Sequence, residues 1–307
     1  MPDPLVLDTQ MHGVDRITAA FAVKDEQTAL IETGAKSSVE TTISALESAG
    51  VERVDWILVT HIHLDHAGAA GTLAARFPEA TIAVHEAGAP HLIDPSKLWA
   101  SATRIYGERM DQLWGGIDPI DPARIRPLKD GDVVDLGGRA LVAVDTPGHA
   151  SHHHAYFDPG RGDLFAGDAL GVLVPDAPAV RPATPPPEFD LGKALSSIER
   201  VKALRPRLLW LTHYGRHDAA LDRSADQTCD EAKIALERWA SWARTARAHG
   251  DGAVQVARHL KALVREDLEH DLSDDAIALL EQTTSYELNA SGLVRYLDKS
   301  ERGHASS

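Results

Sequence analysis

The sequence has little of what marks disulfide-bonded, membrane-spanning or nucleic-acid-binding proteins. A single cysteine, Cys229, in 307 residues excludes an internal disulfide and a cysteine-rich metal site. No run approaches the roughly 20 apolar residues that span a bilayer, and the N-terminus lacks the basic and apolar regions of a signal peptide. Positive charge is scarce, with 31 lysines and arginines against 46 aspartates and glutamates. We therefore expect a cytoplasmic protein that associates with neither nucleic acid nor membranes.

Histidine, by contrast, is abundant, with 16 residues. Imidazole and carboxylate groups must therefore supply the ligands of any bound metal ion, because thiolate is almost absent. The remaining composition, with 43% hydrophobic and 25% charged residues, is ordinary for a globular protein. The length corresponds to one large domain or two smaller ones.

Short apolar runs bounded by turn residues alternate with helix-like stretches along the first two thirds of the chain. The expected strands are residues 16–23, 28–32, 56–60, 132–136, 140–144, 155–157, 164–167 and 208–211. Helical patterns occupy residues 37–48 and 191–204, and apolar residues recur at helical spacing from 226 to about 300. This order predicts an α/β architecture followed by a C-terminal helical extension.

The densest group of metal-type side chains directly follows the expected strand 56–60. His61 and His63 are two residues apart, so in an extended chain they point the same way. Asp65 and His66 can reach a second position as the chain turns into a helix. Three imidazoles and one carboxylate in six residues suit a divalent cation such as zinc, iron or manganese.

Three further candidates each follow an apolar strand, namely His149, Asp168 and His213. Because the ends of strands meet at one edge of a sheet in α/β proteins, we expect all these groups to converge there. Four strand ends that each carry a metal-type side chain favour a metal centre over the alternative that these histidines are isolated structural residues.

Together these residues resemble the metallo-β-lactamase superfamily, whose signature is H-x-H-x-D-H followed by His, Asp and His at strand ends. The resemblance spans about residues 15–215 and implies a four-layer αβ/βα sandwich with the site at one edge. It divides the chain into a catalytic domain, 1–222, and a helical extension, 223–307. It implies two metal sites sharing one aspartate: His61, His63 and His149 on one ion, Asp65, His66 and His213 on the second, and Asp168 on both. Glu32, in the family's early strand-end motif, is expected to be structural rather than ligating.

The chemistry that the resemblance implies is hydrolysis. Two ions about 3.5–4 Å apart lower the pKa of a shared water, and the resulting bridging hydroxide attacks an acyl carbon. Asp65 is the carboxylate expected to orient the hydroxide or to carry its proton to the leaving group. Zinc is the expected metal, with iron or manganese as alternatives. Tyr106 and Tyr214 are candidate hydrogen-bond donors to a substrate oxygen. His152 and His153 are not assigned as ligands, because the two sets are already complete.

Departures from individual branches of the superfamily narrow the substrate. Zinc β-lactamases usually carry a cysteine ligand or lack the bridging aspartate, and flavodiiron proteins have a glutamate where this chain has His63. Nucleic-acid-cleaving members fit poorly with a net charge of −15. The chain resembles glyoxalase II-like hydrolases and lactonases, which act on an ester, thioester or lactone of a small molecule. Residues 251–307 contain eleven acidic and six basic residues, which disfavours a glutathione thioester.

Two alternatives stay open at this point. A persulfide dioxygenase-like oxidoreductase would hold one iron on His61, His149 and Asp168. The second alternative is a phosphodiesterase. The partner is expected to be a small-molecule substrate. The helical extension is a candidate surface for a homodimer or a lid over the pocket.

Overall fold

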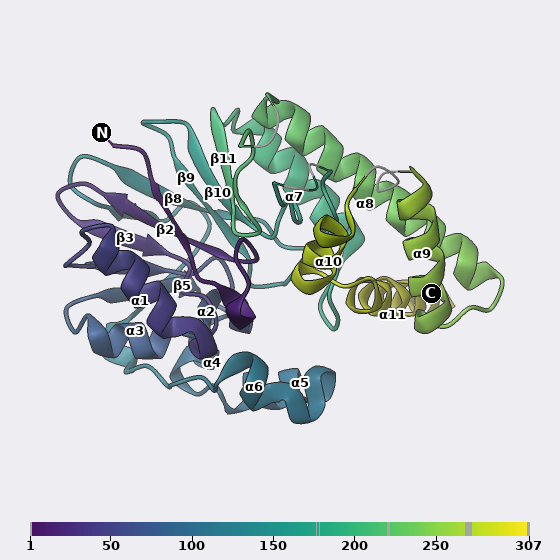
Figure 1. The fold of residues 1–307 in the computed structure, drawn as a ribbon, viewed down its shortest axis with the longest axis horizontal. Coiled ribbons are helices and arrows are strands. Elements are labelled where there is room, and N and C mark those ends of the chain that lie inside the picture. The colour runs from purple at the N-terminus through teal and green to yellow at the C-terminus, as the bar shows by residue number, and fades with distance from the viewer. Residues whose placement is uncertain (1, 176, 178, 220–221, 268–271, 306–307) are drawn as a thin grey trace. The chain divides into compact units, whose positions relative to one another are not determined.

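The protein is described by a computed structural model that covers residues 2–175, 177, 179–219, 222–267 and 272–305. The chain divides into two compact units (Figure 1). Unit 1 comprises Met1–Asp145 and His152–Gly167, and unit 2 comprises Thr146–Ser151 and Asp168–Ser307. The expected domain boundary after residue 222 stays a prediction.

Unit 1 contains a mixed six-stranded sheet in which the strands lie in chain order: β1 (Leu5–Asp8), β2 (Ala19–Lys24), β3 (Thr28–Ile31), β4 (Trp56–Leu58), β5 (Thr81–His85) and β6 (Ile125–Leu128). The pairs from β1 to β3 are antiparallel, and those from β3 to β6 are parallel. Leu30, Ile57 and Ile82 on the parallel strands are fully buried, which explains their continuous apolar runs. The strands β1, β5 and β6 were not among those expected; β6 contains Pro127, which weakens its strand pattern and is tolerated at a sheet edge.

The helices of unit 1 are short, and two of them cover one face of this sheet. They are α1 (Val39–Ser48), α2 (Leu64–Ala67), α3 (Ala70–Arg76), α4 (Ala89–Ile93), α5 (Ser96–Tyr106) and α6 (Met110–Trp114), with 3-10 turns η1 (Met11–Gly13), η2 (Lys36–Ser38), η3 (Gly107–Arg109) and η4 (Pro122–Arg124). Leu46 of α1 and Leu73 of α3 belong to the same buried core as Ile57 and Ile82. The helix expected at 37–48 is therefore confirmed, and its apolar side lies on the sheet.

Four antiparallel strands of unit 1 form the second layer of sheet: β7 (Val133–Asp135), β8 (Ala140–Asp145), β9 (His154–Asp158) and β10 (Asp163–Gly167). The two sheets pack face to face: the ring of Phe21 on β2 lies 5.4 Å from the ring of Phe165 on β10. The hydroxyl of Tyr156, buried between the layers, donates to the carbonyl oxygen of Val59 at 2.9 Å. The strands expected at 132–136 and 140–144 are confirmed.

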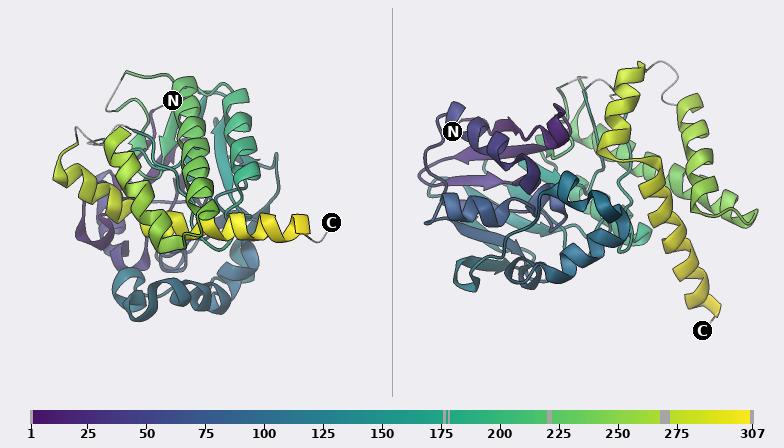
Figure 2. Two further views of the ribbon diagram at one scale, coloured as in Figure 1. Left: turned by 90° about the vertical axis from the view of Figure 1, so that its right-hand side faces the viewer. Right: turned by 60° about the horizontal axis from the view of Figure 1, so that its bottom comes forward.

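Unit 2 is mainly helical. It contains α7 (Leu191–Ala203), β11 (Leu208–Leu211), β12 (Gly215–Arg216), α8 (Ala225–Ala248), α9 (Ala253–Asp267), α10 (Asp274–Thr283) and α11 (Tyr286–Ala305). The long helix α8 begins at a capping box formed by Ser224 and Gln227. Helix α11 crosses α8 and packs along α9 (Figure 2). The expected helical extension is thus confirmed, and none of the helices in the described part of the chain is long and apolar enough to cross a bilayer.

Candidate metal centre

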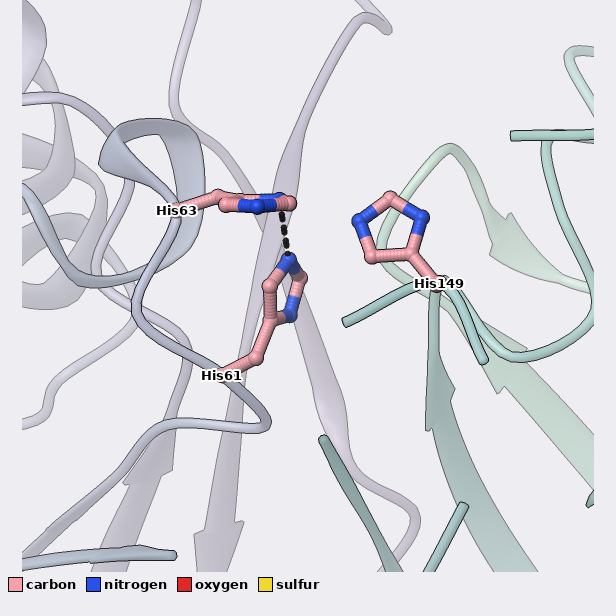
Figure 3. A group of neighbouring side chains, drawn as sticks. All are labelled: His61, His63 and His149. Carbon is pink, nitrogen blue, oxygen red and sulfur yellow. Dashed lines mark hydrogen bonds between the residues drawn. The ribbon is translucent and has the colours of Figure 1, made fainter. Parts of the chain in front are cut away.

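Unit 1 brings together the four predicted ligands that follow β4. His61 and His63 lie in the loop after the strand, and Asp65 and His66 lie in the single turn of α2. Nε2 of His61 is 2.9 Å from Nδ1 of His63 (Figure 3). The ring of His66 lies 4.0 Å from that of His61, and its Nε2 is 3.7 Å from Oδ2 of Asp65. The nitrogen and oxygen atoms of this motif that could bind a metal ion therefore lie close together.

Glu32, the residue that follows β3, contacts this group of side chains through its carboxylate. Its Oε1 accepts from Oγ1 of Thr60 at 2.6 Å and lies 3.0 Å from Nδ1 of His66. Oγ1 of Thr60 also lies 3.0 Å from Nδ1 of His61. The expectation that Glu32 is not a ligand stays a prediction, and sequence reasoning missed its contacts with His66 and, through Thr60, with His61. A fully buried carboxylate needs such partners, so its place at a buried strand end was the available signal.

Unit 2 brings together the other three predicted ligands, His149, Asp168 and His213, all of them buried. Nε2 of His149 lies 3.3 Å from Oδ2 of Asp168, and Nε2 of His213 lies 3.5 Å from Oδ1 of the same carboxylate. Gly148 allows the turn before His149, because it has a φ of +137° and a Cβ there would lie 2.3 Å from the backbone nitrogen of Ala194.

The contacts of the histidine Nδ1 atoms are those expected around a divalent cation. Three of the five predicted histidine ligands, His61, His66 and His149, have Nδ1 within hydrogen-bonding distance of a protein oxygen. For His149 this oxygen is the carbonyl of Ala183, at 3.1 Å. A bond from Nδ1–H leaves Nε2 without a proton and ready to ligate, which is the usual arrangement around protein-bound metals. The two oxygens of Asp168 each face a different imidazole, as a carboxylate shared by two cations requires.

The two candidate tyrosines lie in different units. Tyr106 ends α5 in unit 1, and its ring is 5.1 Å from that of Trp114. Burial, together with the negative charge of Asp65, raises the pKa of the Tyr106 phenol, so the hydroxyl stays protonated. Tyr214 directly follows His213 in unit 2, and its amide donates to the carbonyl oxygen of Leu173 at 3.2 Å.

His152 and His153, which were left unassigned, lie beside the predicted ligands of unit 1. Their rings are 6.3 Å and 4.9 Å from the ring of His61, and both side chains are buried. They therefore form part of the wall around His61.

A third group of metal-type side chains lies in unit 1, where no sequence pattern predicted it. Asp145 and His154 are opposite each other on β8 and β9, and Nε2 of His154 is 2.8 Å from Oδ1 of Asp145. Nε2 of His85, at the end of β5, is 3.7 Å from the same oxygen. The amide of Ala87 donates to Nδ1 of His85 at 3.0 Å, which places the ring proton of neutral His85 on Nε2. Nε2 is thus the nitrogen of His85 that faces Asp145, and the three side chains form a further group that could hold a cation.

Comparison with known proteins gives one family. The metallo-beta-lactamase superfamily matches residues 12–213. A metallo-beta-lactamase fold-containing protein of Sulfurisphaera tokodaii is 26% identical over 200 residues, which cover 62% of this chain and 70% of that protein. A hydroxyacylglutathione hydrolase of Synechococcus sp. is 31% identical over 160 residues, which cover 52% of this chain. That match spans 47% of the hydrolase, about half of its length.

A solved structure supports the fold over nearly the whole chain. A metallo-beta-lactamase family protein of Thermus thermophilus is 20% identical, with a TM-score of 0.66 over 98% of this chain and 95% of that chain. At this identity the likeness concerns the fold alone. The predicted α/β fold class with a C-terminal helical region is confirmed.

Proposed function

The chain belongs to the metallo-beta-lactamase superfamily, and we propose that it is a metal-dependent hydrolase that cleaves an ester, thioester or lactone of a small molecule. The observation that best supports this proposal is the position of the Asp168 carboxylate. One of its oxygens faces Nε2 of His149 and the other faces Nε2 of His213. A simple ion pair needs one such contact, whereas a bridging carboxylate uses both oxygens. Shared carboxylates of this kind belong to sites with two cations.

We assign the seven predicted ligands to two cations, with zinc as the proposed metal. One set is His61, His63 and His149, the other is Asp65, His66 and His213, and Asp168 serves both. When bound, the two cations would lower the pKa of a water molecule at the site and polarise the substrate carbonyl.

The side chains of the protein supply the remaining functions. The Asp65 carboxylate is one-fifth exposed, so it can orient the attacking water, take up its proton and return the proton to the leaving group. Glu32 and Thr60 hold the imidazoles of His61 and His66 in place. The protonated hydroxyl of Tyr106 is the proposed donor to a substrate oxygen, and Tyr214 is a second candidate.

The substrate class follows from the chemistry of acyl transfer and from charge. The hydroxyacylglutathione hydrolases among the relatives support a thioester or a related acyl bond. Residues 251–307, however, carry eleven acidic and six basic residues, which would repel an anionic tripeptide. We therefore propose a substrate with little negative charge.

A turnover screen with the zinc-loaded, full-length protein tests this function. Lactones, thioesters, aryl esters and phosphoesters are offered in parallel to the wild type, to Asp168→Asn and to His85→Gln. We expect turnover of at least one acyl class by the wild type and by His85→Gln, because His85 lies outside the ligand sets, and loss of turnover in Asp168→Asn. If the protein with both zinc ions bound turned over no acyl substrate, the proposal would be contradicted. Turnover of phosphoesters alone, or oxygen uptake with one iron per chain, would favour the alternative activities.

A further inference from the structure

One peptide group in unit 2 connects a proposed metal ligand to the C-terminal helices. On one side, the carbonyl oxygen of Ala183 lies 3.1 Å from Nδ1 of His149. On the other side, the N–H of Thr184 donates to Oδ1 of Asn289 at 2.6 Å. This C=O and this N–H belong to the same planar trans peptide group, in which they point in opposite directions. Fixing the direction of the N–H therefore fixes the direction of the carbonyl.

The side chain of Asn289 is held in one orientation, so it can fix the direction of the Thr184 N–H. It lies in the first turn of α11 and has no exposed surface. Its Nδ2 donates to Oγ1 of Thr284 at 2.8 Å and to the carbonyl oxygen of Ser285 at 3.1 Å. Oγ1 of Thr184 lies 3.0 Å from both Oδ1 and the carbonyl oxygen of Asn289, so its one proton goes to either of them. The side-chain amide thus uses both of its hydrogens, and its oxygen accepts from the Thr184 N–H. Turning the side chain would leave buried polar groups without partners.

The segment that contains this peptide group is also tied to α11 by other contacts. A Cβ on Gly292 would lie 1.8 Å from the carbonyl oxygen of Thr184, so only glycine permits the helix to approach the segment this closely. The guanidinium of Arg181 lies 4.3 Å from the ring centre of Tyr286 and donates to the carbonyl oxygen of Thr284 at 3.0 Å. Residues 181–184 consequently have their position set by the helical region.

We propose that Asn289 is a positioning residue for His149. Through the Ala183–Thr184 peptide group it holds the carbonyl that accepts the Nδ1 proton, and so directs Nε2 toward the cation. This inference rests on the proposed role of His149 as a metal ligand. A partner that fixes the tautomer and orientation of a ligating imidazole raises metal affinity. The C-terminal helical region thereby contributes to the metal centre without contacting the metal.

Zinc binding to the full-length, metal-depleted protein tests the proposal by competition with a chromophoric chelator. Asn289→Leu keeps the volume but removes the acceptor for the Thr184 N–H. We expect this variant to bind one of two zinc equivalents about 10- to 100-fold more weakly. Asn289→Asp keeps an acceptor at the Oδ1 position although it loses both Nδ2 donors, so we expect it to bind zinc more tightly than Asn289→Leu.

A second measurement reports on the imidazole itself. In the zinc-loaded protein, the Nδ1–H resonance of His149 is identified by its disappearance in His149→Ala. We expect this proton to exchange with water faster in Asn289→Leu than in the wild type or in Asn289→Asp. Leu293→Ala removes a buried apolar side chain of the same helix and keeps the hydrogen-bonding groups of Asn289. It should lower the midpoint of thermal unfolding and leave zinc affinity and proton exchange unchanged.

The outcomes separate this proposal from the proposed function. If His149→Ala loses one zinc equivalent while Asn289→Leu binds zinc and protects the Nδ1 proton like the wild type, the positioning role is overturned and the metal centre stands. If His149→Ala keeps full zinc affinity and stoichiometry, the metal centre is overturned as well. Equal weakening in Asn289→Leu and Leu293→Ala would reduce Asn289 to a general structural role and would also overturn the proposal.

Discussion

Oε1 of Glu32 lies 3.0 Å from Nδ1 of His66, and neither side chain has any exposed surface. The same oxygen accepts from Oγ1 of Thr60, which in turn contacts His61. Glu32 has a φ of +66°, an uncommon conformation for a residue other than glycine. The chain therefore accepts an unfavourable backbone angle at the residue whose carboxylate organises the imidazoles, which is typical of functional sites.

Glu32→Gln should weaken zinc binding without preventing folding. Glutamine is nearly the same size, but it has no negative charge to hold the Nδ1–H of His66. Loss of such a partner behind a ligand reduces metal affinity by about 10- to 100-fold. The measurement is zinc competition with a chelator. Glu40→Gln, at an exposed position of α1, is the matched control and should bind like the wild type. Wild-type affinity in Glu32→Gln would remove Glu32 from this role.

If the proposed two-zinc site forms, Asp168→Asn should lower the zinc content and abolish hydrolysis. The amide has one oxygen, so it can serve one cation and not two, and it brings no charge to offset theirs. We expect zinc content to fall from two equivalents toward one, and kcat to fall by at least about 100-fold, as for loss of an electrostatic group at a reaction centre. Elemental analysis and turnover are measured on the same sample. Asp222→Asn, at an exposed position, is the control. Two bound equivalents in Asp168→Asn would argue against bridging.

The pH dependence of stability should depend partly on His217. Burial lowers the pKa of His217, and Nδ1 of its ring accepts from the amide of Leu209 at 3.1 Å, which a protonated ring cannot do. The unfolded chain therefore binds a proton at higher pH than the folded chain. It follows that His217 stabilises the fold above the ordinary pKa near 6.5, and that this contribution is lost as pH falls through the lowered folded-state pKa.

His217→Asn tests this, because its Oδ1 can still accept from the Leu209 amide but does not titrate. Urea unfolding of the metal-free protein is measured from about pH 7 to about pH 5, below the usual histidine pKa. The free energy of unfolding should fall less steeply in the variant than in the wild type. Parallel slopes would mean that His217 does not contribute, since all the other histidines are common to both proteins.

The residues proposed as metal ligands could be picked out in the sequence because they follow apolar strands. The motif from His61 to His66 is contiguous, and His149, Asp168 and His213 each follow a strand pattern. Local pattern suffices in such cases, since the topology of an α/β sheet brings strand ends together. Strand β6 was missed for the opposite reason, because Arg126 and Pro127 give it no apolar alternation.

The partners behind the ligands could not be predicted in the same way. Asn289 contacts Thr184 across 105 residues, and Glu32 contacts His66 across 34. Asn289 does not differ, in the sequence, from an ordinary helix residue, and the strand-end position of Glu32 does not show which side chains it contacts. Such contacts are fixed by the packing of separate elements, which periodicity does not encode.

Tyr106→Phe should lower turnover without changing the metal content. Burial and the charge of Asp65 raise the pKa of the Tyr106 phenol, so at working pH the hydroxyl is a hydrogen-bond donor. Loss of one such bond to a substrate oxygen costs about 1.4 kcal/mol, or roughly tenfold in kcat/KM. A fall in kcat at constant KM would place this bond in the transition state, whereas a rise in KM alone would place it in substrate binding. Tyr296→Phe, whose ring lies 5.9 Å from that of Phe189 in unit 2, is the control and should keep full activity. Unchanged kcat/KM in Tyr106→Phe, measured on the substrate that the screen identifies, would leave Tyr106 as a packing residue against Trp114.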